Sequence, residues 1–299
     1  FTGIELIQIK SSIYDTKFVI GENIQSITDE RSVQPFYMNA YETNYTLWYT
    51  IRNKAELEYI FQNPGQEGSE GKRGKSPTTD AKWQPVTTIN WRDAIVWCNA
   101  LSEIEGRTPC YTYNDIVLRD STDAAQIDLC VCDYNADGYR LPTETEWEYA
   151  ARKTGTTFQD GNLVSGAITE EGISNPDALE TDYCWNELNS TGTANIGTAG
   201  SLFDTNCTPG CGNANGMGLF DMSGNVLEFC NDWYEEYYNP SSLIDNKLYY
   251  DGPQYGNARV SRGGSWSIFA SYCYCGDRYA YDPDESYNYM GFRFCTTRK

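Results

Sequence analysis

Two thiols, Cys273 and Cys275, are separated by one residue near the C-terminal end of the chain. In an extended strand, residues two positions apart project to the same face, so both thiols would point the same way. If that face is inward, both cysteines are packing residues; if not, they are candidates for a catalytic pair. The chain has no histidine, which excludes Ser-His-Asp and Cys-His catalysis and every histidine-based metal site.

A second group of candidate side chains surrounds a glycine turn in "GLFDMSGNVLEFCNDWY". Asp221, Gly224, Asn225 and Glu228 bring several oxygen atoms close together, and such oxygens are the ligands that calcium prefers. The alternative is a tight turn that leads into a strand. The side chains of that strand would then fill the core, through Leu227, Phe229 and Trp233.

A third feature is the tyrosine-rich segment "SIFASYCYCGDRYAYDPDESYNYM", residues 267–290, in which six of 24 residues are Tyr. They fall in three pairs two positions apart, and this alternation predicts strands in which each pair lies on one face: Tyr272 and Tyr274, Tyr279 and Tyr281, and Tyr287 and Tyr289. If all six were buried, six phenol hydroxyls would each need a hydrogen-bond partner, so we expect most of them to be exposed. Exposed Tyr mixed with Ser, Gly, Asp and Asn is typical of antibody-like binding surfaces. The alternative is an ordinary aromatic-rich strand and loop.

We therefore predict that the exposed part of this segment binds a ligand. The predicted contacts are Ser267, Ile268, Phe269, Ser271, Tyr272, Tyr274, Asp277, Tyr279, Tyr281, Asp282, Asp284, Tyr287, Asn288 and Tyr289.

Three helices are expected to position these groups. One begins after an N-cap at Thr43, a second begins after Asn90 and ends near Gly106, and a third follows a capping box of Thr143 and Glu146. Elsewhere, short β-like runs alternate with Gly and Asn turns, and no linker divides the chain convincingly. The sequence therefore predicts a mixed α+β chain that is rich in loops.

Composition narrows the choice of partners. The formal net charge is -20 in 299 residues, which excludes nucleic acid and anionic membrane surfaces as partners, because both need a basic face. The 11 cysteines favour an exported protein, and Cys207 and Cys211 could close a small loop. Because the chain opens at Phe1, we expect a mature form whose membrane attachment, if any, uses an anchor outside this sequence.

Several motifs then carry a resemblance. They are "TINWRDAIVWCNALSE", "GYRLPTETEWEYAAR", "NGMGLFDMSGNVLEFCNDWY", "RGGSW" and "GFRF". Together they resemble the formylglycine-generating-enzyme, or sulfatase-modifying-factor, family from about Phe36 to the C-terminus. The resemblance implies an α+β fold of the C-type-lectin type, with short strands, a few helices and long loops. We expect one such domain over 36–299 and an N-terminal extension, 1–35, packed on it.

The resemblance also implies two kinds of metal site. Calcium would bind the carboxylates of Asp221 and Glu228 and the carbonyls of Gly224 and Val226. Family members that oxidise a protein cysteine use copper and two cysteines; the first position falls on Cys273, but the second falls on Arg278, which cannot replace a thiolate. Cys275 has a different spacing from the family's pair.

The tyrosine-rich segment also resembles the variable regions of proteins diversified by retroelements. In those systems adenine changes at Asn codons cannot yield Trp, Met, Lys, Gln or Glu, and within 267–290 only Glu285 and Met290 belong to that set. We therefore predict a receptor- or adhesin-like ligand-binding protein, displayed at a bacterial cell surface or exported, which binds an unknown protein or other macromolecule. We expect it to be a monomer. One form of attachment to the cell surface would be a lipoprotein anchor outside this sequence. The alternatives are a copper-dependent oxidase of a protein cysteine and a calcium-dependent carbohydrate-binding module.

Overall fold

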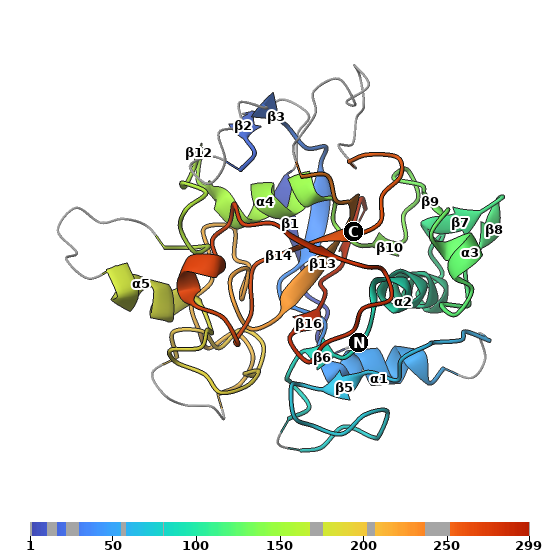
Figure 1. Cartoon of the computed structure of the whole chain (residues 1–299), viewed down its shortest axis with the longest axis horizontal. Helices are drawn as coiled ribbons and strands as arrows, with labels where there is room; N and C mark the ends of the chain where they lie inside the picture. Colours follow the sequence, from blue (N-terminus) through green and yellow to red (C-terminus); the bar gives the residue numbers. More distant parts are fainter. Residues whose placement is uncertain are drawn as a thin grey trace.

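The computed structural model describes residues 2–10, 17–21, 30–54, 58–79, 81–167, 176–201, 207–236 and 252–298. Two four-stranded sheets and three helices make the frame, and loops join them (Figure 1). In the described part of the chain, no helix is both long and apolar enough to cross a membrane.

The first sheet brings the two ends of the chain together. Its order is β1 (Leu6–Lys10), β4 (Phe36–Asn39), β17 (Cys295–Thr296) and β10 (Tyr139–Arg140), and every pairing is antiparallel. The segment expected as an extension therefore contributes an edge strand to this sheet.

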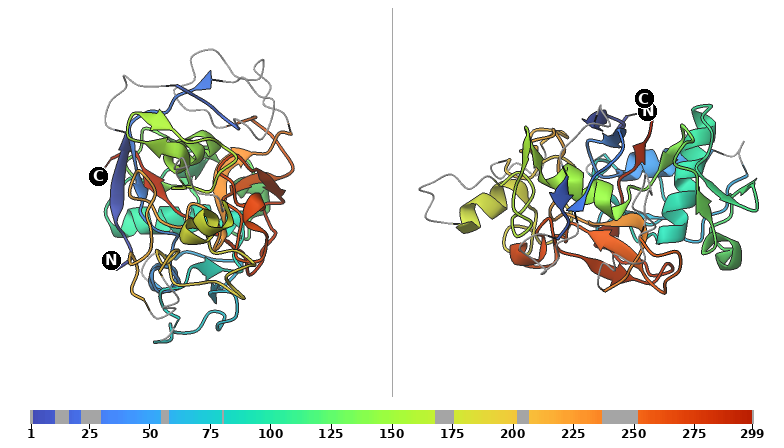
Figure 2. Two further views of the ribbon diagram at one scale, coloured as in Figure 1. Left: turned by 90° about the vertical axis from the view of Figure 1, so that its left-hand side faces the viewer. Right: turned by 90° about the horizontal axis from the view of Figure 1, so that it is seen from above.

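The second sheet carries the tyrosine-rich segment. Its order is β15 (Tyr279–Tyr281), β14 (Arg259–Arg262), β13 (Leu227–Trp233) and β16 (Met290–Gly291), with β13 and β16 parallel. Strand β13 is buried over almost its whole length, which agrees with the expectation that this stretch fills the core. Seen from above, the orange and red strands lie along the lower edge of the molecule, away from blue β1 (Figure 2).

Smaller sheets close the loops around this frame. They are β2 (Phe18–Val19) with β3 (Glu30–Arg31), β5 (Gln66–Glu67) with β6 (Val86–Thr87), β11 (Lys153–Thr154) with β12 (Thr157–Phe158), and β7 (Tyr111–Tyr113) between β8 (Ile116–Val117) and β9 (Val131–Cys132).

The helices begin close to where their capping residues predict. Helix α4 (Glu144–Arg152) begins with the expected capping box of Thr143 and Glu146, and α2 (Trp91–Ile104) begins after the expected N-cap Asn90, which also forms a capping box, with Asp93. Helix α1 (Tyr45–Arg52) begins one residue later than expected: Asn44, not Thr43, is the N-cap, and its side chain accepts a hydrogen bond from the Leu47 amide. Two further helices, α3 (Ala124–Ile127) and α5 (Pro176–Tyr183), lie in the loops.

Aromatic rings join α1 and α2 to the C-terminal "GFRF" motif. The rings of Trp48 and Trp97 stack with centroids 6.1 Å apart, and Phe292 meets the edge of Trp97 at 5.3 Å. Phe294 lies against Trp97 and Tyr139. These contacts fix the chain directly after the tyrosine-rich segment in the main core, so the segment is held at its far end.

Candidate ligand-binding surface

The tyrosine-rich segment is anchored at its start by two glycines. Gly263 and Gly264 have φ values of 90° and 71°, a conformation that favours glycine. A Cβ atom on Gly264 would lie 2.4 Å from the Cys273 sulfur and 2.7 Å from the Tyr272 carbonyl oxygen. A larger residue at Gly264 would therefore push the segment away from its support.

Main-chain hydrogen bonds hold the segment along its length. The amides of Cys275 and Gly276 donate to carbonyls of residues 163 and 161, at 3.0 and 2.8 Å. The Tyr287 carbonyl accepts from the Thr88 amide at 3.0 Å, and the Tyr289 carbonyl accepts from the Leu227 amide at 2.8 Å. These bonds fix the backbone and leave the side chains free to point outward.

All six tyrosines of the segment are at least partly exposed. Tyr272 is 56% exposed and Tyr287 38%, and Phe269 beside them is 51% exposed. The expectation that most of the six tyrosines are exposed was wrong, because the other four are half-buried. Of the remaining predicted contacts, Ser271, Asp282 and Asp284 are exposed and Ser267, Ile268, Asp277 and Asn288 are half-buried.

The local structure around the first tyrosine pair differs from the prediction. Residues Ala270–Tyr272 form a 3-10 helix, η2, rather than a strand, so Tyr272 and Tyr274 are not a same-face pair on a strand. Tyr279 and Tyr281 do lie in a strand, β15, as the alternation predicts.

Hydroxyl groups of several of these tyrosines have hydrogen-bond partners. The Tyr274 hydroxyl donates to Glu180 of α5 at 3.0 Å, and the Tyr279 hydroxyl donates to the Tyr272 carbonyl at 2.5 Å. The Tyr287 hydroxyl donates to Glu285 at 2.9 Å. The contact with Glu180 spans 94 residues of sequence and has no local signal, so sequence reasoning missed it.

Three of the rings form an aromatic group at the end of the segment. The rings of Tyr287 and Tyr289 stack with centroids 5.1 Å apart, and Tyr281 meets Tyr287 edge-on at 6.0 Å. A turn beside them is closed by the Asp282 amide, which donates to the Glu285 carboxylate at 2.9 Å. The surface therefore combines ordered aromatic rings with exposed carboxylates.

Cys273 and Cys275 do not form a pair. Both are fully buried, but Cys273 packs with Val164 and Cys184, whereas Cys275 belongs to the cluster around Trp147. Burial raises the pKa of Cys275 to about 12. These two sulfurs do not face one common site, so the residues do not fit a copper ion held by Cys273 and Cys275.

Arg278, at the position of the family's second cysteine, is part of a buried ion-pair cluster. This α4 ion-pair cluster consists of Glu144, Glu148, Arg152, Arg262 and Arg278. Arg278 Nε lies 2.5 Å from Glu144, and Arg262 bridges Glu144 and Glu148 at 2.8 and 2.7 Å. Burial alone would raise the pKa of Glu144, but Arg278 and Arg262 lower it to about 2. Arg278 therefore anchors β15 to α4.

The predicted calcium ligands lie beside a buried arginine. Both oxygens of Glu228 accept hydrogen bonds from Arg293, at 2.6 and 2.7 Å, and Trp147 donates to one of them at 2.8 Å. Asp221 accepts from the Gly197 amide through Oδ2, and its buried Oδ1 has no hydrogen-bond partner among the described residues. Asp221 thus offers an oxygen to a cation, whereas Glu228 would first have to release Arg293.

Among the described side chains, no group of three or more His, Cys, Asp or Glu residues is arranged to hold a metal ion. Calcium binding at Asp221, Gly224, Val226 and Glu228 therefore stays a prediction.

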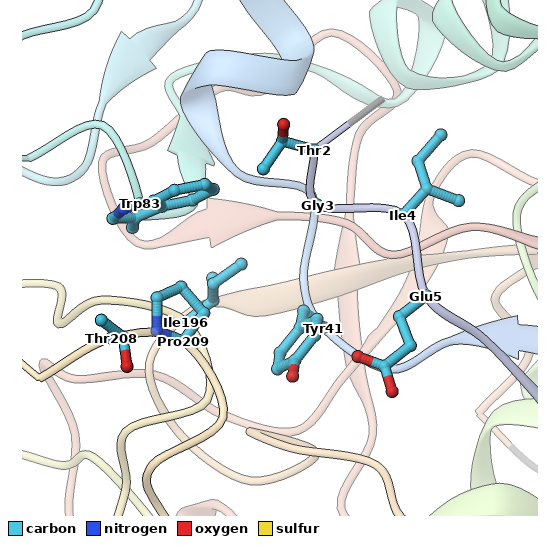
Figure 3. A pocket seen from close by; sticks show the side chains of 9 residues that line it. All are labelled: Thr2, Gly3, Ile4, Glu5, Tyr41, Trp83, Ile196, Thr208 and Pro209. Carbon is cyan, nitrogen blue, oxygen red and sulfur yellow. The ribbon is translucent and has the colours of Figure 1, made fainter.

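A separate pocket of about 250 Å³ lies between the N-terminal segment and the loop closed by the Cys207–Cys211 disulfide (Figure 3). The rings of Trp83 and Tyr41 frame it, and Pro209 comes from the disulfide loop. Burial, followed by the neighbouring Glu5 carboxylate, raises the pKa of Tyr41 to about 12. No residue of 267–290 lines this pocket, so it is independent of the tyrosine-rich surface.

The chain resembles several characterised proteins. It is 28% identical to the formylglycine-generating enzyme of Bos taurus over 275 residues, 88% of this chain and 66% of the relative. It is 29% identical to the chaperone protein LppX of Paenibacillus barcinonensis over 243 residues, 79% of this chain and 70% of the relative. The chain thus spans about two thirds of the length of these relatives.

A solved structure covers nearly the whole chain. Treponema denticola variable protein 1 superposes with a TM-score of 0.72 and 28% identity, over 98% of this chain and 94% of that one. The profile of the sulfatase-modifying factor enzyme 1-like domain matches residues 12–298. The chain therefore belongs to the formylglycine-generating-enzyme, or sulfatase-modifying-factor, family and has its α+β fold of the C-type-lectin type.

Proposed function

We propose that the chain is a ligand-binding protein, displayed at a bacterial cell surface or exported, whose binding surface is the exposed part of residues 267–289. The observation that carries the proposal is the contrast within this segment. Its main chain is bonded to the scaffold at both ends, while Phe269, Tyr272 and Tyr287 remain exposed. Rigidly held aromatic side chains give large contact area at a small cost in conformational entropy.

The similarity to Treponema denticola variable protein 1 supports the further proposal that this surface is diversified. The ligand is a protein or another macromolecule, because the aromatic groups are spread over the segment rather than gathered in one deep cavity. Cys273 is fully buried and Arg278 replaces the second thiol, so the oxidase alternative has no supporting observation in the site.

The experiment compares exposed tyrosines inside and outside the segment. Ligands captured from host or environmental extracts are identified, purified and titrated against Tyr272→Ser, Tyr287→Ser and Tyr255→Ser variants. Tyr255 is 71% exposed and lies outside the segment, so it is the matched control. We expect each variant within the segment to lose about 2 kcal/mol of affinity, roughly 30-fold, and the control to bind like the parent.

Equal affinities for all three variants and the parent would place the binding surface elsewhere. Diversification is tested separately in the genome: we expect a reverse-transcriptase gene beside a near-copy of the codons for 267–290 in which Asn codons are substituted. A locus without this copy would overturn the diversification proposal while leaving the binding surface in place.

A further inference from the structure

Two buried thiols from distant parts of the sequence meet beneath the tyrosine-rich segment. Cys184 follows α5, and Cys273 follows η2; both are fully buried and belong to one small apolar cluster with Val164 and Ala167. Burial, and then the neighbouring Cys273 thiol, raises the pKa of Cys184 well above its usual value. Membership of one small cluster places the two thiols in the same buried space beneath the segment.

The backbone around the two thiols is held in register by hydrogen bonds. The Glu187 amide donates to the Ile268 carbonyl at 3.0 Å, and the Gly224 amide donates to the Gly263 carbonyl at 2.7 Å. The hydroxyl of Ser223 donates to the Cys273 carbonyl at 2.7 Å. These bonds bring the chain after Cys184 and the chain around Cys273 against the same turn.

Glycines leave the space that the sulfurs occupy. A Cβ atom on Gly224 would lie 2.6 Å from the Cys184 sulfur, and one on Gly264 would lie 2.4 Å from the Cys273 sulfur. Cys275 lies elsewhere: its sulfur is 3.6 Å from Gln159 Nε2 and 3.9 Å from the Ala151 carbonyl oxygen. Cys273 is therefore the thiol of this segment that faces Cys184.

We propose that Cys184 and Cys273 form a disulfide bond that ties the start of the tyrosine-rich segment to the scaffold. The oxidant is a small-molecule disulfide such as oxidised glutathione, which reacts with the thiols during folding, before they are buried. Two S–H bonds break and one S–S bond forms, while two electrons and two protons convert the oxidant to two molecules of thiol. The Cys207–Cys211 disulfide agrees with folding in an oxidising compartment.

The bond would convert a position that the family uses for catalysis into a structural one. It would also close a long loop, and the constraint that a disulfide places on the unfolded chain grows with loop length in the chain-entropy description. The inference does not depend on the proposed ligand-binding function.

The direct test is a disulfide map. The reduced chain is refolded in a mixture of reduced and oxidised glutathione, alkylated, and digested without reduction for mass spectrometry. We expect one cross-linked peptide pair that contains Cys184 and Cys273, and its loss after treatment with reductant. Recovery of both residues as alkylated thiols, or Cys184 joined to a different cysteine, would overturn the proposal.

A second measurement gives the effect on stability. In a Cys207→Ser/Cys211→Ser background, oxidation should raise the melting temperature by at least about 4 °C relative to the reduced protein. Adding Cys184→Ser or Cys273→Ser should abolish this difference, whereas adding Cys275→Ser, the matched control, should preserve it. A difference that survives Cys184→Ser would contradict the proposal; if that variant does not fold, the peptide map of the unaltered chain still decides.

Discussion

Arg278 and Tyr272 are six positions apart in one segment, yet they belong to different parts of the molecule. The Arg278 side chain is 2% exposed and lies in the α4 ion-pair cluster, whereas Tyr272 is 56% exposed and has its ring at the surface. This difference shows that residues 267–290 do not form a loop that lies wholly on the surface of a separate scaffold. Buried anchors, which are Cys273, Cys275 and Arg278, alternate with outward side chains, so scaffold and surface are interleaved residue by residue.

The largest expected effect comes from removing a buried anchor. Arg278→Ala should lower the free energy of unfolding by about 3–5 kcal/mol, because Glu144 would keep a buried charge with one partner fewer. The control is Arg119→Ala, which removes an ion pair with Glu103 in which the arginine side chain is 42% exposed, and should cost about 1 kcal/mol or less. Urea unfolding measures both. Equal losses in the free energy of unfolding for the two variants would show that the buried Arg278 ion pair stabilises the fold no more than the exposed Arg119 pair.

Acid should weaken the same cluster. The pKa of Glu144 is about 2 in the folded protein, below its ordinary value of 4.5, so its stabilising contribution is complete above about pH 4.5 and is lost as the pH falls toward 2. Urea unfolding at a series of pH values should show this decline, and Glu144→Gln should flatten it. An unchanged slope in Glu144→Gln would mean that other carboxylates cause the acid sensitivity.

Calcium should act on the scaffold and not on the tyrosine surface. If calcium binds at Asp221, a concentration 100 times the Kd should stabilise the fold by about 2.7 kcal/mol. Chelation should then lower the melting temperature of the parent and leave Asp221→Ala unaffected. Glu228→Ala is less suitable than Asp221→Ala, because it also removes the carboxylate that pairs with the buried Arg293. If neither calcium nor chelator changes the melting temperature of the parent, the chain has no such site.

The smallest expected effect is on stability at the exposed positions. Phe269→Ser, Tyr272→Ser and Tyr287→Ser should each change the free energy of unfolding by less than about 0.5 kcal/mol. The same measurement on Tyr279→Ser should give a larger loss, because that side chain is half-buried and its hydroxyl is bonded to the Tyr272 carbonyl. Similar losses in the free energy of unfolding for Tyr272→Ser and Tyr279→Ser would contradict the division of the segment into exposed and anchoring side chains.

Local signals in the sequence were sufficient for the helix starts but not for the segment's interior. The N-cap at Asn90 and the capping box at Thr143 involve neighbours three residues away, so the sequence predicted both helix starts. Thr43 and Asn44 can both cap a helix, and the choice between them was wrong by one residue. The family resemblance, confirmed over residues 12–298, predicted the fold that composition alone left as a loop-rich α+β chain.

Long-range contacts explain what the sequence did not reveal. Alternation predicted a strand at Tyr272 and Tyr274, but this stretch folds as a 3-10 helix whose following residues bond to Ser223 and, through the Tyr274 hydroxyl, to Glu180. Cys184 likewise meets Cys273 across 89 positions of sequence. No pattern of spacing within 267–290 encodes either partner.

The hydrogen bonds that hold the segment have a consequence for its evolution. Scaffold groups form hydrogen bonds with the carbonyls of Cys273, Tyr287 and Tyr289 and with the amides of Cys275 and Gly276. These main-chain atoms are the same whichever side chain the residue carries. A codon change from Tyr to Asn or Asp at 287 or 289 would alter what the surface offers to a partner and keep the peptide groups that dock it. Side chains of the segment can thus change while its main chain keeps the same hydrogen bonds to the scaffold.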